Sequence, residues 1–124
     1  MSLFVETRGE GPPLVLLHGW TMHGGVFAPL VERLASRFTL HLVDLPGHGY
    51  SRDSTVPLRL DACVESVSAI VPRAPWCGWS LGGLVALHAA TTRPDEVPAL
   101  AMLCASPCFV KGEDWKHGVS ADIF

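Results

Sequence analysis

Short apolar runs alternate with amphipathic stretches along this chain of 124 residues. The apolar runs are four to seven residues long and are bounded by proline or polar residues, which is typical of buried strands. The expected strands are 4–7, 14–17, 38–43, 76–79 and 99–105, and apolar residues at helical spacing predict helices over 25–37, 60–71 and 81–92. This alternation predicts an α/β fold: a doubly wound, mostly parallel sheet with a leading antiparallel strand.

Composition narrows the class of protein. The formal net charge is −3 at pH 7 and the Lys and Arg residues are scattered, so no nucleic-acid-binding surface is expected. Hydrophobic residues make up 48% of the chain, which is enough for one core and argues against disorder. The apolar runs are too short to cross a bilayer, and residues 1–13 lack a signal-peptide pattern. We therefore expect a cytoplasmic protein with no membrane partner.

The four cysteines give no sign of a metal or disulfide framework. Without a secretory signal, Cys63, Cys77, Cys104 and Cys108 are expected to be reduced and buried. No paired Cys or His motif completes a zinc site around Cys104 and Cys108. We expect no metal and no organic cofactor.

The pattern Gly-x-Ser-x-Gly occupies residues 78–82, between an expected strand and an expected helix. A serine at such a junction is held in a strained conformation that lifts its hydroxyl clear of the sheet, and the glycines avoid collisions with the neighbouring strand and helix. The pattern predicts Ser80 as a nucleophile toward an acyl carbon. The backbone N–H of Leu81, at the start of the helix, is expected to donate to the developing oxyanion.

Two further segments follow expected strands: 18–20 (His-Gly-Trp) and 44–51 (Asp-Leu-Pro-Gly-His-Gly-Tyr-Ser). Together with the serine motif, they resemble the α/β-hydrolase superfamily along essentially the whole chain. The resemblance implies that the backbone N–H of Trp20 is the second oxyanion donor. It also implies that His18 braces its loop, because the catalytic order in this superfamily is serine, acid, histidine.

Two polar residues of the segment 44–51 have structural explanations. Asp44 is expected to anchor the following Pro-Gly turn through side-chain hydrogen bonds. His48 lies within that turn and is expected to be exposed.

The chain is similar to a narrower family, the BioH carboxylesterases, which hydrolyse the methyl ester of pimeloyl-acyl-carrier protein in bacterial biotin synthesis. The residues that carry this similarity are 38–47, 78–86 and 105–109, including Trp79 before the serine and Ser-Pro-Cys-Phe after the last expected strand. The resemblance implies an acyl-Ser80 intermediate. It places Trp20 and Leu81 at the acyl end of a substrate bound to an acyl carrier protein.

The end of the chain departs from the family pattern. Residues 1–110 are expected to form the N-terminal portion of the hydrolase core, and 111–124 the start of a connection into a cap domain. The stretch 120–124 is expected to begin a helix. The family's acid and base would follow later strands, supplied by a longer protein or by a second chain. The chain alone is therefore expected to be nearly inactive, since a serine needs its base.

Three other interpretations make different demands on these residues. A different acyl or C–C bond hydrolase of the same superfamily would share the serine motif and differ in its cap and pocket. A non-catalytic half that only assembles with a complementary chain would not need Ser80. A dinucleotide-binding site is rejected, because serine stands where the Gly-x-Gly-x-x-Gly pattern has its second glycine and no acidic residue follows at the required distance.

Overall fold

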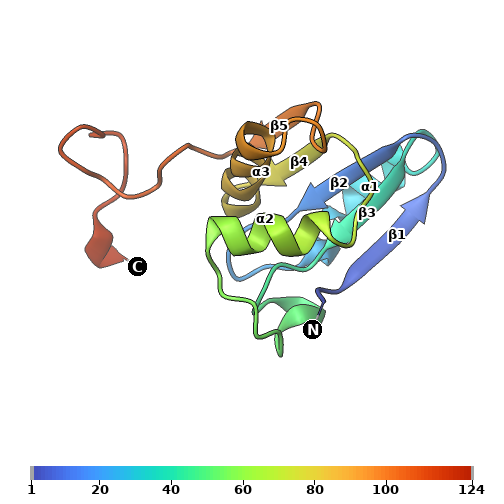
Figure 1. The fold of residues 1–124 in the computed structure, drawn as a ribbon, viewed down its shortest axis with the longest axis horizontal. Coiled ribbons are helices and arrows are strands. Elements are labelled where there is room, and N and C mark those ends of the chain that lie inside the picture. Colours follow the sequence, from blue (N-terminus) through green and yellow to red (C-terminus); the bar gives the residue numbers. More distant parts are fainter. Residues whose placement is uncertain (1, 124) are drawn as a thin grey trace.

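The computed structural model describes residues 2–123 and contains one five-stranded sheet (Figure 1). The strands are β1 (Val5–Gly9), β2 (Pro13–Leu17), β3 (Thr39–Val43), β4 (Trp76–Trp79) and β5 (Leu100–Leu103). They lie in the order β1-β3-β2-β4-β5. β1 runs antiparallel to β3, and the other neighbours are parallel. The α/β fold and the leading antiparallel strand are thus confirmed.

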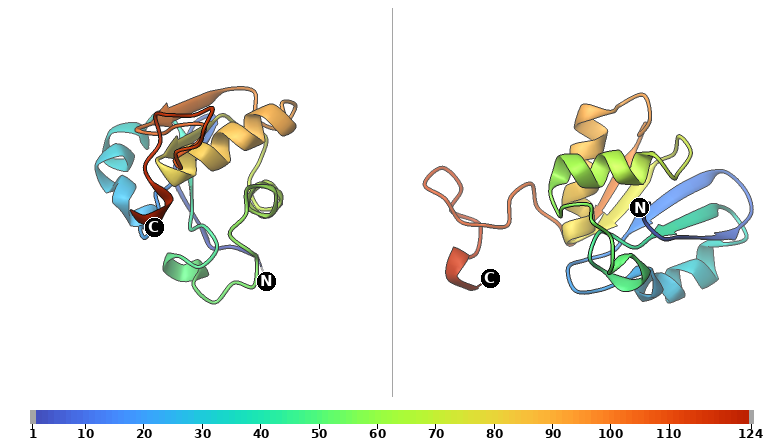
Figure 2. Two further views of the ribbon diagram at one scale, coloured as in Figure 1. Left: turned by 90° about the vertical axis from the view of Figure 1, so that its left-hand side faces the viewer. Right: turned by 60° about the horizontal axis from the view of Figure 1, so that its bottom comes forward.

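Helices cover both faces of the sheet (Figures 1 and 2). The α-helices are α1 (Ala28–Leu34), α2 (Leu60–Ser68) and α3 (Leu81–Thr92), and the short 3-10 helices are η1 (Gly24–Phe27), η2 (Gly49–Ser51) and η3 (Ala121–Ile123). α1 lies on one face, while α2 and α3 lie side by side on the other. The result is the three-layer arrangement of a doubly wound sheet.

The alternation of side chains along β2 divides the core into two layers. Val15 and Leu17 pack with apolar residues of α2 and α3, whereas Leu16 packs with residues of α1 and η1. All three side chains are fully buried. Burial on both faces explains why this strand reads as a continuous apolar run in the sequence.

The register of the parallel strands brings their carboxyl ends to one edge of the sheet. Leu17 at the end of β2 is paired with Val43 at the end of β3 and with Gly78 in β4, and Trp79 is paired with Leu103 at the end of β5. The loops that follow these four strands therefore meet at the same edge, where doubly wound folds place their ligand sites.

Several expected elements differ from those observed. The helix expected at 60–71 ends at Ser68, and the strand expected at 4–7 is observed at Val5–Gly9. The expected helix at 25–37 is shorter, because residues Gly24–Phe27 form the tighter η1 before α1 begins. The apolar run 99–105 suggested a strand covered on both sides, but β5 has only β4 as a neighbour within residues 2–123 and its side chains are half-buried or exposed. The stretch 120–124 forms a 3-10 turn at Ala121–Ile123, and Phe124 lies outside the described residues.

The chain leaves the sheet after β5 and continues as an extended arm (Figures 1 and 2). Within this arm the backbone of Val110 bridges to Val119, and Gly112 bridges to Trp115. In the part of the chain that the structure describes, no helix has the length and apolar character needed to span a bilayer.

The two-layer core generates the first prediction. Leu16→Ala removes a fully buried side chain from the middle of the sheet and should lower the free energy of unfolding by roughly 2–5 kcal/mol. The matched control Leu58→Ala, at a residue that is 46% exposed, should change it by less than about 0.5 kcal/mol. Urea denaturation followed by circular dichroism measures both, and equal losses for the two variants would contradict the assignment of Leu16 to the core.

Candidate active site

Ser80 occupies the sharp junction between β4 and α3. Its backbone has φ 54° and ψ −116°, in the positive-φ region that residues other than glycine rarely adopt. The N–H of Ser80 donates to the carbonyl of Leu103 at 3.0 Å, and its own carbonyl accepts from the N–H groups of Gly83 and Leu84 at 2.9 and 3.2 Å. The residue is therefore fixed between the end of β5 and the first turn of α3, with its side chain half-buried.

The glycines on either side of Ser80 permit a very close approach of backbone segments. A Cβ atom on Gly78 would overlap the backbone carbonyl of Gly82, and a Cβ on Gly82 would overlap the carbonyl of Leu17 in β2. Because these obstacles are backbone atoms, they cannot move aside as a flexible side chain could. The expectation that residues 78 and 82 must be glycine is confirmed, and the reason is steric.

Leu81 is the first residue of α3. The N–H groups in the first turn of a helix have no acceptor within the helix, and the helix dipole makes this end electropositive. Leu81 is half-buried beside Ser80. The N–H of Leu81 therefore lies in the electropositive first turn of α3, directly after the serine in the chain.

The loop after β2 packs directly against Ser80. A Cβ built on Gly19 would lie 3.4 Å from the Cβ of Ser80 and 3.1 Å from the ring of Trp79. The next residue, Trp20, is 54% exposed at the rim of this edge. The loop segments that carry Trp20, Ser80 and Leu81 are thus brought together from β2 and β4.

His18 and Asp44 brace this edge, as expected from the sequence. The Nδ1–H of His18 donates to the Gly19 carbonyl at 2.7 Å, and its Nε2 accepts from the N–H of Leu45 at 2.9 Å. Asp44 accepts from the N–H groups of Gly24 and Tyr50 at 2.7 and 2.9 Å through its two carboxylate oxygens. Both side chains are buried and link loops that follow different strands.

The expectation that His48 is exposed is wrong. Its side chain is 9% exposed, with Nδ1 donating to the carbonyl of Pro46 at 2.9 Å and Nε2 accepting from the N–H of Thr21 at 3.0 Å. Its ring lies 5.1 Å from that of His18. The turn folds back onto the loop after β2, and this long-range contact left no local pattern in the sequence. In residues 2–123 neither histidine is bonded to Ser80.

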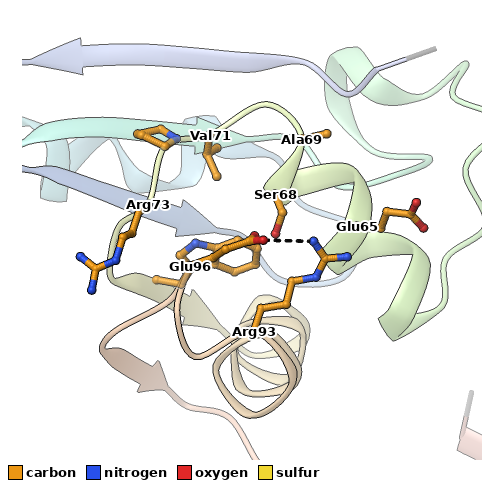
Figure 3. A pocket seen from close by; sticks show the side chains of 9 residues that line it. Glu65, Ser68, Ala69, Val71, Arg73, Arg93 and Glu96 are labelled. Carbon is orange, nitrogen blue, oxygen red and sulfur yellow. Dashed lines mark ion pairs between the residues drawn. The ribbon is translucent and has the colours of Figure 1, made fainter.

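One cavity of the structure lies far from the serine. It has a volume of about 370 Å³ and lies between the ends of α2 and α3, where Arg93 pairs with Glu96 at 3.5 Å (Figure 3). Trp76, the first residue of β4, lines this cavity, whereas Ser80 follows the last residue of β4. The cavity therefore belongs to the opposite edge of the sheet.

A second cavity adjoins the candidate site. It has a volume of about 510 Å³ and is formed by the loops after β2 and β3 together with residues before α2. Trp20, Met22 and Leu58 give it an apolar wall, and His48 contributes to its base. Its position beside Trp20 suits the apolar part of a substrate.

The cysteines divide into two pairs. Cys63 and Cys77 are buried, and burial raises the pKa of the Cys63 thiol to about 11 and also raises the pKa of Cys77. Cys104 and Cys108 are exposed, so the expectation of burial is wrong for them. Among residues 2–123 all four are free, and no group of three or more His, Cys, Asp or Glu side chains is arranged to hold a metal.

The neutral state of His18 generates a pH prediction. Burial lowers the pKa of His18 below its ordinary value of 6.5, so the unfolded chain takes up the proton first as the pH falls. The stabilisation by the neutral ring is complete above the unfolded pKa and is lost as the pH drops below it. The urea concentration at the unfolding midpoint should therefore decrease as the pH is lowered from about 7.5 to about 5.5.

Two variants distinguish the contribution of His18 to this pH dependence from that of His41. Burial also lowers the pKa of His41, so this residue too makes the protein less stable as the pH falls. His18→Gln should flatten the pH dependence more than His41→Gln, because His18 is fully buried and His41 is not. A His18→Gln protein whose midpoint still falls as steeply as that of the wild type would contradict this assignment.

Comparison with known proteins identifies the family of the chain. Residues 12–122 match the family model described as the alpha/beta hydrolase fold. The chain is 62% identical over 122 residues to the pimeloyl-acyl-carrier protein methyl ester esterase of Stenotrophomonas maltophilia strain R551-3, covering 98% of this chain and 47% of that protein. It is 59% identical to the protein of the same name from Xanthomonas campestris pv. campestris strain B100, covering 98% and 48%.

Solved structures show the same likeness. The esterase EaEST from Exiguobacterium antarcticum superposes with a TM-score of 0.81 at 25% identity, covering 98% of this chain and 48% of that one. A marine microorganism esterase also gives 0.81, at 26% identity, covering 90% and 44%. The chain spans about half the length of the relatives it matches. The matched family model, together with the observed strand order and the serine junction, establishes that the chain belongs to the α/β-hydrolase fold family.

Proposed function

We propose that the protein containing this chain is a serine carboxylesterase that hydrolyses the methyl ester of pimeloyl-acyl-carrier protein. The observation that carries the proposal is the conformation of Ser80, a non-glycine residue at φ 54° between β4 and α3. The substrate is proposed from the names of the relatives that are 58–62% identical to this chain. A cytoplasmic location is part of the same proposal.

In the proposed reaction, Ser80 Oγ attacks the ester carbonyl carbon. The tetrahedral intermediate collapses to an acyl-Ser80 ester as the carbonyl–methoxy bond breaks and methanol leaves with the serine's proton. Water then attacks the acyl-enzyme, which releases the free carboxylate and one proton and restores the Ser80 hydroxyl. No metal or organic cofactor takes part.

The oxyanion formed in both steps is proposed to bind the backbone N–H groups of Trp20 and Leu81. Each such donor is worth about 3–4 kcal/mol of transition-state stabilisation in serine hydrolases. The packing of Gly19 against Ser80 and the start of α3 at Leu81 support this assignment. The acyl chain would lie in the 510 Å³ cavity beside Trp20.

The acid and the base are proposed to come from the other half of the complete protein, in the same polypeptide or in a second chain. Both His18 and His48 have both ring nitrogens bonded to backbone groups, so neither is available to Ser80. We further propose that 1–110 is the N-terminal portion of the core and that 111–124 leads into a cap domain. The departure of the arm from the sheet after β5 supports this division (Figure 1).

Removal of the nucleophile tests the reaction. In the full-length protein, Ser80→Ala should lower kcat/KM for methyl esters by about 10⁴-fold or more and abolish labelling by a fluorophosphonate. The matched control is Ser68→Ala, because the Ser68 hydroxyl lies in the distant cavity without a hydrogen-bond partner. Wild-type activity in Ser80→Ala would instead support the non-catalytic role.

Substrate profiling tests the specificity. The full-length protein should cleave the pimeloyl methyl ester on acyl-carrier protein with a kcat/KM at least about 10-fold above that for the methyl ester of a shorter acyl chain on the same carrier, since apolar pocket contacts discriminate by roughly that factor. Efficient cleavage of other acyl groups without cleavage of pimeloyl methyl esters would assign the protein to a different hydrolase of the same fold.

A further inference from the structure

Two histidines join the loop after β2 to the loop after β3 in a reciprocal manner. His18, in the loop after β2, accepts from the N–H of Leu45, whereas His48, in the loop after β3, accepts from the N–H of Thr21. Each ring donates its other nitrogen to a carbonyl of its own loop. The bond from Thr21 matters most for the site, because Thr21 follows Trp20 directly.

Residues 19–22 form a tight turn that carries Trp20. The N–H of Met22 donates to the Gly19 carbonyl at 3.1 Å, which closes the turn. Thr21, its third residue, has φ 67°, and Trp20 is not among the positive-φ residues of the described chain. These features match a type II turn, in which the peptide between the second and third residues is flipped relative to a type I turn.

The residue at the third position is unsuited to this turn. A type II turn favours glycine or asparagine there, and threonine is β-branched, so positive φ brings its side chain into conflict with the backbone. A type I turn would relieve the conflict by turning the Trp20–Thr21 peptide over. The N–H of Thr21 would then point away from His48, and the bond of 3.0 Å would be lost.

We propose that His48 is a positioning residue: by accepting from the N–H of Thr21 it holds the 19–22 turn in its type II form. This fixes the direction of the Trp20 carbonyl and the course of the loop that carries the proposed Trp20 donor. The inference rests on the proposed function, because it concerns the Trp20 donor. His48 is not bonded to Ser80, and because it also lines the cavity proposed for the acyl chain, rescue by a second variant is what isolates its effect on the turn. The burial of His48 and the bond of its Nδ1–H to Pro46 keep the acceptor nitrogen directed at Thr21.

Glycine favours the third position of a type II turn, so a glycine at position 21 should make the bond from His48 dispensable. If His48 only contributed to overall stability, this substitution would not restore kcat. In the full-length protein, His48→Phe keeps an aromatic ring but removes the acceptor. It should lower kcat by about 5- to 10-fold, because a loosened turn displaces the proposed Trp20 donor and the oxyanion forms only in the transition state. Thr21→Gly favours the type II turn by itself. The double variant Thr21→Gly/His48→Phe should therefore recover kcat to within about 2-fold of Thr21→Gly alone.

The matched control is His41→Phe, a histidine on β3 that contacts Thr7 and lies outside both loops; it should leave kcat unchanged. Unchanged kcat in His48→Phe, or a loss that Thr21→Gly does not rescue, would overturn the proposal. Crystal structures give a readout that does not depend on activity: φ of Thr21 should become negative in His48→Phe, and residue 21 should keep its positive φ in the double variant. A full-length wild-type protein whose Ser80 does not react with a fluorophosphonate would refute the proposed function. The φ angle of residue 21 in the variant structures would still show whether His48 holds the turn.

Discussion

The close approach of α3 to the sheet is the constraint on which the candidate site depends. Gly78 and Gly82 bring the first turn of the helix against β4 and β2 at distances that no side chain could share. The chain must then reverse within a single residue, and that residue, Ser80, takes φ 54°. The cost of such a conformation is of order 1–3 kcal/mol and must be offset by the surrounding packing. The same geometry sets the serine beside the helix N-terminus, so one steric arrangement places the proposed nucleophile at an electropositive helix end.

The loops around the serine are held by side-chain acceptors rather than by strand pairing. Asp44, His18 and His48 each accept from backbone N–H groups of a neighbouring loop, and all three are buried. A buried acceptor that loses its donor is costly, so these bonds restrict the loops to one arrangement. Because Trp20 lies in one of these loops, its position is determined by residues from the next strand along the chain. The loops of the candidate site are thus held in place by contacts within the fold itself.

Much of this arrangement could be predicted because it depends on local patterns. The strand at 76–79 and the helix at 81–92 match the observed elements to the residue, since Pro75, the glycines and Pro94 delimit them. The helix at 25–37 was predicted too long, because apolar spacing does not distinguish a 3-10 turn from an α-helix. The burial of His48 and the exposure of Cys104 could not be predicted, because each depends on which distant segment packs nearby. The roles of Ser80, Leu81 and Trp20 remain predictions supported by geometry.

A structure of the full-length protein after reaction with a methyl phosphonate ester tests the central claim most directly. The account predicts a covalent bond between Ser80 Oγ and phosphorus, with one phosphonyl oxygen about 2.7–3.1 Å from the backbone nitrogens of both Trp20 and Leu81. An adduct on a different residue, or a Ser80 adduct whose oxygen faces solvent while these two N–H groups point elsewhere, would contradict it.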